Sequence, residues 1–268
     1  MRSVDVTGTR HQSLLPPVRQ GDLDWWQILG EAGRLWAGPG GVEVGDEWWT
    51  AISGRSNINY NLSCCHSPDP DVLVDRCLNP TLQIGKPALI MLSGPGLVTA
   101  QKLVESRWVT VGALPLMALP DPVGFDTDRS GVERLDRGQL GSARQMLAEC
   151  YGLDLASAET AFPDAVADRP DMAAWGLFAE GRLVSCVATV RQDGVVVVWS
   201  MATRPDCQKR GYGRRLLETV LNLHFEQGAS ASLLHSSRVA EVLYAQAGYR
   251  VVEYLQLWSR PRWALGVA

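Results

Sequence analysis

Apolar and polar positions in the first half of the chain follow helical and strand periods in turn. Residues 22–37 carry apolar side chains at helical spacing, with Asp22 or Asp24 in place to cap the helix, and the glycines of 38–41 end it. The pattern predicts further strands over 42–53, 57–65, 87–92 and 108–117, and further helices over 70–84 and 97–106.

The second half has a longer and more regular pattern. It predicts a helix over 138–151 and strands over 172–179, 182–191 and 194–201. Residues Val195–Met201 are apolar and β-branched, so we expect both faces of this strand to be buried. Between the halves, residues 118–130 are rich in proline, aspartate and glycine, which predicts a linker.

Composition places the chain among ordinary globular proteins. It has 268 residues, 46% of them hydrophobic and 20% charged, with a formal net charge of −4. The length allows one large domain or two smaller ones, each with its own core. The mildly acidic balance disfavours a nucleic-acid partner.

The six cysteines form no Cys-x-x-Cys pair, so we expect no metal site. The N-terminus lacks a long apolar region, which predicts no signal peptide, and no apolar run approaches the ~18 residues that a membrane span needs. These features predict a cytoplasmic protein with free thiols and no membrane partner.

The chemistry is concentrated after the predicted strand 194–201. A basic, glycine-containing loop runs from Arg204 to Gly213, and a helix with an apolar stripe from Leu216 to His224 follows. Glycines let the backbone approach an anion, and the unpaired N–H groups of a helix start point at it. The stretch 204–215 carries five basic side chains against Asp206. Neither a Walker A pattern nor a dinucleotide fingerprint is present, so another phosphate-binding class is indicated.

Two motifs in this region resemble those of the GNAT N-acetyltransferases. Gln208-Lys209-Arg210-Gly211-Tyr212-Gly213 resembles the family's (Gln/Arg)-x-x-Gly-x-(Gly/Ala) signature, and Leu243–Tyr249 resembles its Leu-Tyr-x-x-x-Gly-Phe motif. The resemblance covers residues 131–260. It implies an α+β fold of two GNAT-like lobes, each a mixed, mostly antiparallel sheet flanked by helices, and acetyl-CoA or another acyl-CoA as co-substrate, without a metal.

The resemblance also implies roles for individual residues. The amides of 208–213 would hold the pyrophosphate, backbone groups of Met201 and Thr203 would pair with the pantetheine arm, and Tyr244 would protonate the leaving thiolate. A backbone N–H near Met201 would polarise the thioester carbonyl. The residues implied for donor binding are Met201, Thr203, Gln208, Lys209, Arg210, Gly211, Tyr212, Gly213, Arg214 and Ser237.

The general base departs from the family pattern. Many members carry a glutamate on the central strand, whereas Val195–Met201 contains no carboxylate. A base from elsewhere, a chain of waters, or an amine that arrives neutral would each serve. His235 is a candidate catalytic base because imidazole titrates near neutrality; the alternative is a positioning or packing role.

The first half resembles the first lobe of tandem GNAT proteins, through Gly85–Leu92, Ser106-Arg107-Trp108 and Pro115-Leu116-Met117. It lacks a phosphate loop, since residues 66–71 hold two prolines and two aspartates that would repel a pyrophosphate. We therefore expect a degenerate lobe over 1–120 that does not bind CoA, a linker over 121–130, and an acyl-CoA-binding domain over 131–268.

Three other features of the first half have plainer interpretations. The pairs Trp25-Trp26 and Trp48-Trp49 are expected to pack in the core, with one of Trp48 and Trp49 free to line a cleft. Acidic side chains near Glu43 are expected at a solvated strand end. Cys64-Cys65-His66 is only a weak candidate for a thiol–imidazole nucleophile, because adjacent residues rarely face one site.

Together these observations predict an N-acetyltransferase that moves an acetyl group from acetyl-CoA to a small-molecule amine by direct attack. Two alternatives stay open: a non-catalytic acyl-CoA-binding module, and transfer of a longer acyl group. The predicted partner is a small-molecule amine, with no nucleic acid or membrane, and the chain is a monomer or a homodimer.

Overall fold

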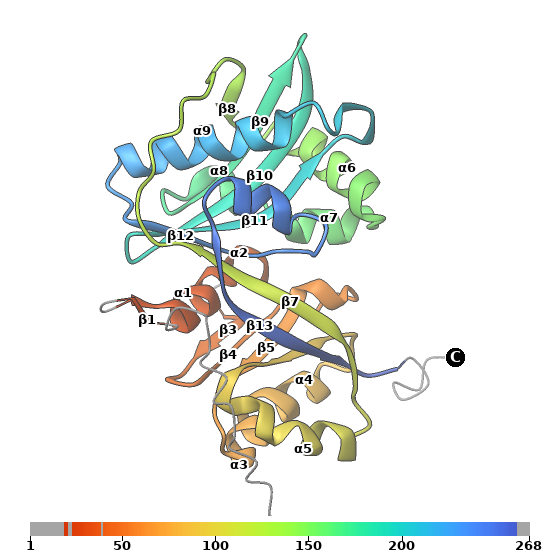
Figure 1. Ribbon diagram of the computed structural model, residues 1–268. Helices are drawn as coiled ribbons and strands as arrows, with labels where there is room; N and C mark the ends of the chain where they lie inside the picture. The colour runs from red at the N-terminus through yellow and green to blue at the C-terminus, as the bar shows by residue number, and fades with distance from the viewer. Residues whose placement is uncertain (1–18, 21–22, 39, 262–268) are drawn as a thin grey trace, which may run out of the picture.

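The computed structural model describes residues 19–20, 23–38 and 40–261, which form a mixed, mostly antiparallel sheet flanked by helices (Figure 1). Eleven strands of this described part share one sheet, in the order β3-β4-β5-β6-β13-β7-β12-β11-β10-β9-β8. The predicted α+β class is confirmed.

The first half supplies seven strands and five α-helices among the described residues. They are β1 (Arg19–Gln20), β2 (Leu23–Asp24), α1 (Trp25–Ala32), α2 (Arg34–Ala37), β3 (Val42–Val44), β4 (Trp48–Ile52), β5 (Asn61–Cys65), α3 (Pro70–Val72), α4 (Asn79–Gln83), β6 (Leu89–Leu92), α5 (Ala100–Glu105) and β7 (Val109–Leu119). Short 3-10 turns cover Ile58–Tyr60 and Gly94–Thr99, and a π-helical segment covers Leu73–Leu78.

The second half follows the same alternation. Its elements are β8 (Val132–Arg134), α6 (Leu140–Tyr151), α7 (Leu155–Ala161), α8 (Ala165–Asp168), β9 (Met172–Ala179), β10 (Arg182–Gln192), β11 (Val195–Thr203), a 3-10 turn over Pro205–Cys207, α9 (Tyr212–Glu226), β12 (Ala231–His235), α10 (Glu241–Gln246) and β13 (Arg250–Ser259).

The two halves exchange strands at the centre of the sheet. Strand β7 of the first half pairs with β12 of the second, and β13 of the second half pairs with β6 of the first. Between them β7 and β13 pair with each other, antiparallel, from Arg250↔Ala118 to Ser259↔Val109. Figure 1 shows these two strands crossing the waist of the molecule side by side. One continuous sheet therefore joins what the sequence predicted as two lobes.

Three groups of buried side chains cover the sheet. One runs the length of one face and packs α1 and α2 with α6, α7 and α8. On the other face, α9 buries Leu216, Leu217, Val220 and Leu221 against the second half. The segment from Leu73 to Leu103 covers the same side of the first half. Trp25 and Trp49 are each 1% exposed, which confirms their predicted place in the core. Trp48 lies beneath the guanidinium of Arg76, 5.5 Å from its ring centroid.

Element boundaries shift slightly from the prediction. The first long helix begins at Trp25 with Asp24 as its cap, whose carboxylate accepts from the amide of Trp26 at 3.1 Å. The other proposed cap, Asp22, lies outside the described residues. Strand β7 extends to Leu119, so it takes the first two residues of the predicted linker. The rest of the linker is held against α9, where the side chain of Asn222 bonds the backbone of Phe125 in both directions, at 3.0 and 2.8 Å.

Candidate functional site

The start of α9 is shaped to receive an anion. Gly211 precedes the helix with φ +82°, in the left-handed region that favours glycine, and no side chain caps the helix. The first N–H groups of α9 therefore have no partner within the helix. A Cβ at Gly211 would meet nothing within 4 Å, whereas a Cβ at Gly213 would lie 3.0 Å from Thr203 Oγ1 and 3.3 Å from Met201 Cε. Gly211 thus leaves open space at the start of α9 into which a pyrophosphate fits. Gly213 lets the start of α9 pack closely against β11.

The basic side chains around this loop divide into two groups. Arg204 pairs with Asp206 at 3.4 Å, Arg214 with Glu218 at 2.6 Å, and Arg215 with Asp128 at 3.2 Å. No ion pair forms at Lys209 or Arg210 within the part of the chain that the structure describes. These two side chains are therefore the cations available to an incoming phosphate, and the other predicted charges are already compensated.

Strands β11 and β12 open apart next to this loop. They pair in parallel only from Val195↔Ala231 to Val197↔Leu233, after which β12 continues along β7. Beyond that point β11 bulges, because its register against β10 slips between Trp199 and Ala202, and Ser200 takes φ +51°. The divergence exposes backbone between the strands, where a pantetheine arm needs partners.

A cavity of about 380 Å³, here called the central cavity, lies at this divergence. It receives side chains from both halves. They are Asn59, Tyr60, Leu62, Leu89, Met91 and Leu114 from the first half, Leu257 from the exchanged strand β13, and Leu147, Tyr151, Leu153, Val198, Trp199, Ser200, Met201, His235, Ser236, Ser237, Ala240 and Tyr244 from the rest of the second half. Four predicted site residues, Met201, His235, Ser237 and Tyr244, therefore meet in one place. The loop from Gln208 to Arg214 lies outside this lining.

Tyr244 is held in the wall of the central cavity by α10. Its side chain is 7% exposed, and its hydroxyl donates to Met201 Sδ at 3.7 Å. Burial raises the pKa of Tyr244 to about 12, so the phenol keeps its proton at any physiological pH. Tyr244 thus lies next to Met201, the residue beside which the sequence predicted the thioester.

His235 is neutral in this setting. Burial lowers the pKa of His235 to about 4, and its ring lies edge-on to Trp199 with centroids 5.5 Å apart. Its Nε2 atom is buried and has no hydrogen-bond partner among the described residues. So low a pKa makes the imidazole a weak base, which favours the positioning alternative over general base catalysis.

The carbonyls predicted to pair with pantetheine each accept a side-chain hydrogen bond. The hydroxyl of Tyr151 donates to the carbonyl of Met201, and Gln208 Nε2 donates to the carbonyl of Thr203 at 3.1 Å. A carbonyl oxygen has a second lone pair, so both can still accept from a ligand. Ser237 is exposed, and its hydroxyl accepts from the amide of Ala240 at 3.3 Å, which orders the start of α10.

Residues that the sequence did not single out complete the site. Tyr60 reaches the cavity from the first half, where burial raises its pKa to about 12 against the opposing effect of a hydrogen bond to Ser200. Tyr151 comes from the end of α6 and Trp199 from β11. No local signal marks Tyr60 or Tyr151, because each becomes a site residue only through contacts made by distant segments.

The matching edge in the first half is closed. Strands β5 and β6 pair in parallel from Leu62↔Leu89 to Cys65↔Leu92, and the amide of Ser93 extends the pairing to Cys65. The loop that follows β5 contains no glycine, and Asp69 caps α3. This edge offers neither the gap nor the glycine loop found after β11.

The cysteines of the first half are buried and not accessible to a substrate. Cys64 is 1% exposed, and burial raises the pKa of its thiol. His66 Nδ1 bonds Ser93 Oγ at 3.0 Å and its ring stacks near Trp26. A thiol held protonated is a poor nucleophile, and although a hydrogen bond with Cys77 lowers the pKa of Cys65, that side chain is 0% exposed, so the weak Cys64-Cys65-His66 hypothesis gains no support.

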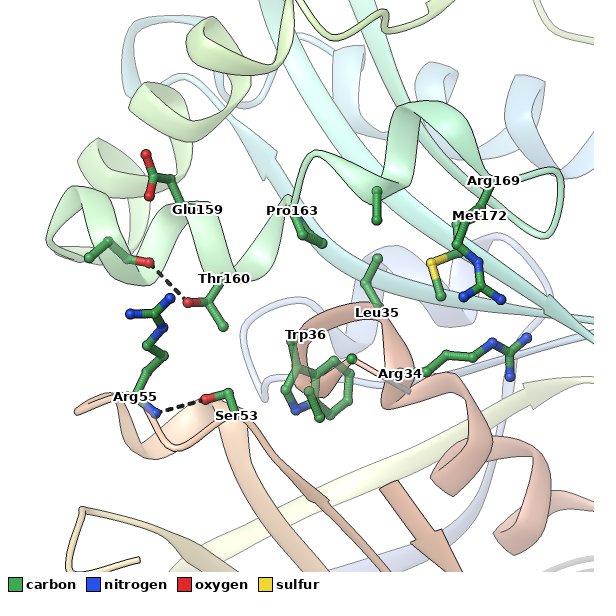
Figure 2. A pocket seen from close by; sticks show the side chains of 14 residues that line it. Arg34, Leu35, Trp36, Ser53, Arg55, Glu159, Thr160, Pro163, Arg169 and Met172 are labelled. Carbon is green, nitrogen blue, oxygen red and sulfur yellow. Dashed lines mark hydrogen bonds between the residues drawn. The ribbon is translucent and has the colours of Figure 1, made fainter. Parts of the chain in front are cut away.

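A second cavity of about 360 Å³ lies between α2 and the helices α7 and α8 (Figure 2). Figure 2 shows Arg34 and Arg169 on one side and Arg55 with Glu159 on the other. Arg34 and Arg169 both bind Asp171, at 3.2 and 2.8 Å, so their charge is partly compensated. Trp36 forms part of its wall and stands edge-on to Trp199, with centroids 4.5 Å apart. Trp36 thus lines the second cavity and Trp199 lines the central one.

The described residues supply neither a metal centre nor a membrane-spanning helix. They contain no group of three or more histidine, cysteine or acidic side chains placed to hold a metal ion. None of their helices is long and apolar enough to cross a membrane.

Residues 141–249 match the sequence model of the acetyltransferase (GNAT) family. Both predicted motifs lie within this match, the loop at 208–213 and the segment at 243–249. The sequence matches none of the curated proteins with which it was compared.

Solved structures share the fold over most of the chain. A GCN5-related N-acetyltransferase from Kribbella flavida is 19% identical with a TM-score of 0.61, covering 87% of this chain and 96% of its own. A putative GNAT-family acetyltransferase from Novosphingobium aromaticivorans is 15% identical with a TM-score of 0.57, covering 88% and 96%. A GCN5-related N-acetyltransferase from Sphaerobacter thermophilus is 14% identical with a TM-score of 0.56, covering 80% and 78%. At identities this low, the TM-scores and coverages establish a common fold and nothing more specific.

Proposed function

Because residues 141–249 match the sequence model of the acetyltransferase (GNAT) family, we propose that the protein moves an acetyl group from acetyl-CoA to the amine of a small molecule. One observation carries the proposal. The hydroxyl of Tyr244 lies against Met201 at the bulge of β11, where β11 and β12 have separated and the anion-binding start of α9 is adjacent. A donor held by its pyrophosphate at α9 would reach this point with its thioester.

Different residues of the site bind different parts of the donor. Lys209, Arg210 and the free amides from Gly211 onward hold the pyrophosphate. The separated edge of β11 accepts the pantetheine arm, with the amide near Met201 directed at the developing oxyanion. Acetyl-CoA, when bound, supplies a thioester that an amine can attack without a covalent enzyme intermediate.

Tyr244 serves the leaving group as a hydrogen-bond donor. The carbon–nitrogen bond forms, the carbon–sulfur bond breaks, and the thiolate leaves next to the phenol. With the pKa of Tyr244 near 12 and that of a thiol about 8.5, full transfer of the phenolic proton would be uphill by about 5 kcal/mol. Tyr244 therefore stabilises the thiolate by a hydrogen bond. The proton that the thiol finally carries comes from the attacking nitrogen.

The test is isothermal titration with acetyl-CoA of the full chain and of Gly211→Glu, which would place a carboxylate where the pyrophosphate binds. Gly228→Glu is the matched control, because Gly228 stands beyond the other end of α9 with nearly the same backbone angle, φ +83° against +82°. We expect one donor per chain, lost in Gly211→Glu and retained in Gly228→Glu. Absence of binding to the native chain would overturn the proposal, and two donors per chain would contradict a single donor site.

An amine panel with detection of free CoA thiol then separates the enzyme from a non-catalytic acyl-CoA-binding module. The absence of a carboxylate on Val195–Met201 is the observation that favours the module. Amine-dependent thiol release supports the enzyme; tight acetyl-CoA binding without release by any amine supports the module.

A further inference from the structure

The walls of the central cavity carry no ionised side chain. None of its lining residues, all within the described part of the chain, is aspartate, glutamate, lysine or arginine. Its titratable members are Tyr60, Tyr151, Tyr244 and His235. Burial raises the pKa of each tyrosine and lowers that of His235, so all four are neutral at pH 7.

Charged side chains line the second cavity instead. Arg34, Arg55, Glu159 and Arg169 surround that cavity (Figure 2), and its wall residue Trp36 meets Trp199 of the central cavity edge-on, with centroids 4.5 Å apart. An ammonium group entering the central cavity would lose water and meet no carboxylate. Burial of an uncompensated charge costs several kcal/mol, so the site discriminates against amines that are protonated at pH 7.

A second, independent feature points the same way. No carboxylate on β11 stands ready to deprotonate an ammonium ion, and the imidazole of His235 is held neutral against Trp199. An amine that is already neutral needs neither a counter-ion nor a base before it attacks. The composition of the walls and the lack of a base therefore select the same kind of acceptor.

The lining also sets the shape of the acceptor. The first half contributes Leu62, Leu89, Met91 and Leu114, and the second half contributes the ring of Trp199. The volume of about 380 Å³ exceeds twice the ~150 Å³ of a cavity that holds one benzene ring. One aromatic ring and the transferred acetyl group fit in that space.

On the basis of the proposed function, we infer that the acceptor is an apolar, weakly basic amine, an arylamine or a close analogue, which binds in the central cavity with its nitrogen uncharged. The nitrogen attacks the thioester carbon, the carbon–sulfur bond breaks, and the nitrogen gives up one proton that ends on the thiol. The first half thus supplies the acceptor-binding surface although it binds no donor.

The experiment compares two isomers, 4-methylaniline and benzylamine, with acetyl-CoA at pH 7. They have the same atoms and nearly the same shape, but 4-methylaniline is neutral and benzylamine is an ammonium ion. We expect kcat/KM to be at least tenfold higher for 4-methylaniline. Equal values, or a preference for benzylamine, would overturn the inference. Acetyl-CoA binding by titration keeps the two proposals distinct: without it both fall, and with it a preference for charged amines removes this inference alone.

A matched pair of variants tests the electrostatic cause. Asn59 is exposed at the rim of the cavity, so Asn59→Asp adds a carboxylate to the wall with almost no change in shape. Asn57→Asp adds the same charge two residues away, outside the lining, and keeps the side-chain oxygen that accepts from the amide of Asn59 at 2.9 Å. We expect Asn59→Asp to raise kcat/KM for benzylamine about three- to tenfold and to change that for 4-methylaniline less than twofold. Asn57→Asp should alter neither, and an equal response of both variants would contradict the inference.

Discussion

The protonation state of Tyr244 is set by its surroundings. The phenol is enclosed between α10 and the bulge of β11, and burial raises its pKa to about 12. The same enclosure aims the hydroxyl at Met201, where a leaving sulfur would stand. Its identity as a site residue was predicted from a seven-residue motif, but its protonation state follows only from burial.

We expect Tyr244→Phe to lower kcat about 100-fold with acetyl-CoA affinity unchanged, because the hydroxyl interacts with the thiolate and not with the intact donor. Free-thiol detection gives kcat and titration gives the affinity. Tyr254→Phe is the control, since that exposed hydroxyl bonds Glu241 at 3.3 Å outside the cavity. A similar loss in both variants would mean that the effect of Tyr244 is structural.

His224 makes the fold sensitive to acid. Burial lowers its pKa to about 4, while its Nε2 bonds Thr189 Oγ1 at 3.1 Å. Because the folded pKa lies below the ordinary value of 6.5, the stabilisation is fully present above pH 6.5 and is lost as the pH falls toward 4. We expect the free energy of unfolding to decrease by about 1.4 kcal/mol per pH unit in that window from this residue alone. Urea denaturation at pH 7 and pH 5 measures it, and a native-like slope in His224→Gln would refute the assignment.

At the scale of elements, the loop before α9 is where sequence and structure agree best. Strand, basic loop and helix follow one another as predicted, and Gly211 has the positive φ that its motif implies. The chain's charge was less informative. Five basic side chains were visible between 204 and 215, but only the folded arrangement shows that Arg204, Arg214 and Arg215 are taken by carboxylates.

This division gives a prediction for donor affinity. The double variant Lys209→Ala with Arg210→Ala should weaken acetyl-CoA binding about tenfold, because these cations have no carboxylate of their own. Arg214→Ala should weaken it less than twofold, since its guanidinium is engaged by Glu218 at 2.6 Å. Titration of both variants decides, and a larger loss for Arg214→Ala would reverse the assignment.

Local pattern explains why other elements were found or missed. Strands β9, β10 and β11 were predicted within two residues, because each is a long, mainly apolar run closed by turn residues, and β10 and β11 are also rich in valine. Helices α7 and α8 are short and their apolar faces are narrow. The spacing of apolar residues over 155–168 therefore did not predict a helix. The bulge at Ser200 depends on the register against β10, which no local pattern encodes.

At the scale of the whole molecule, the exchange of β7 and β13 makes the halves interdependent. The predicted boundaries at 120 and 131 fall in the segment between β7 and β8, but three strand pairs of the sheet cross them, β6 with β13, β13 with β7 and β7 with β12. The sequence carried no sign of this, because pairing between strands more than a hundred residues apart is a matter of tertiary contact. The Arg34–Asp171 ion pair at 3.2 Å adds a further link between the halves.

We therefore expect residues 131–268 to be unable to fold alone, since β12 would lose β7 and β13 would lose both neighbours. Cleavage within the exposed residues 121–124 should instead leave the two pieces associated, because the sheet and not the linker joins them. Circular dichroism of the fragment and size-exclusion chromatography of the cleaved chain test this. Cooperative unfolding and acetyl-CoA binding by the fragment alone would contradict it.

The exchanged strand also sets the order of events during synthesis. Strand β6 is wholly buried in the folded sheet, yet its neighbour β13 is made only when residues 250–259 leave the ribosome. At about 5–20 residues per second, the apolar edge of β6 waits on the order of ten seconds for its partner. Throughout that interval the nascent chain exposes a strand edge that other chains can join, so low expression temperature and chaperone holding should raise the yield of folded protein.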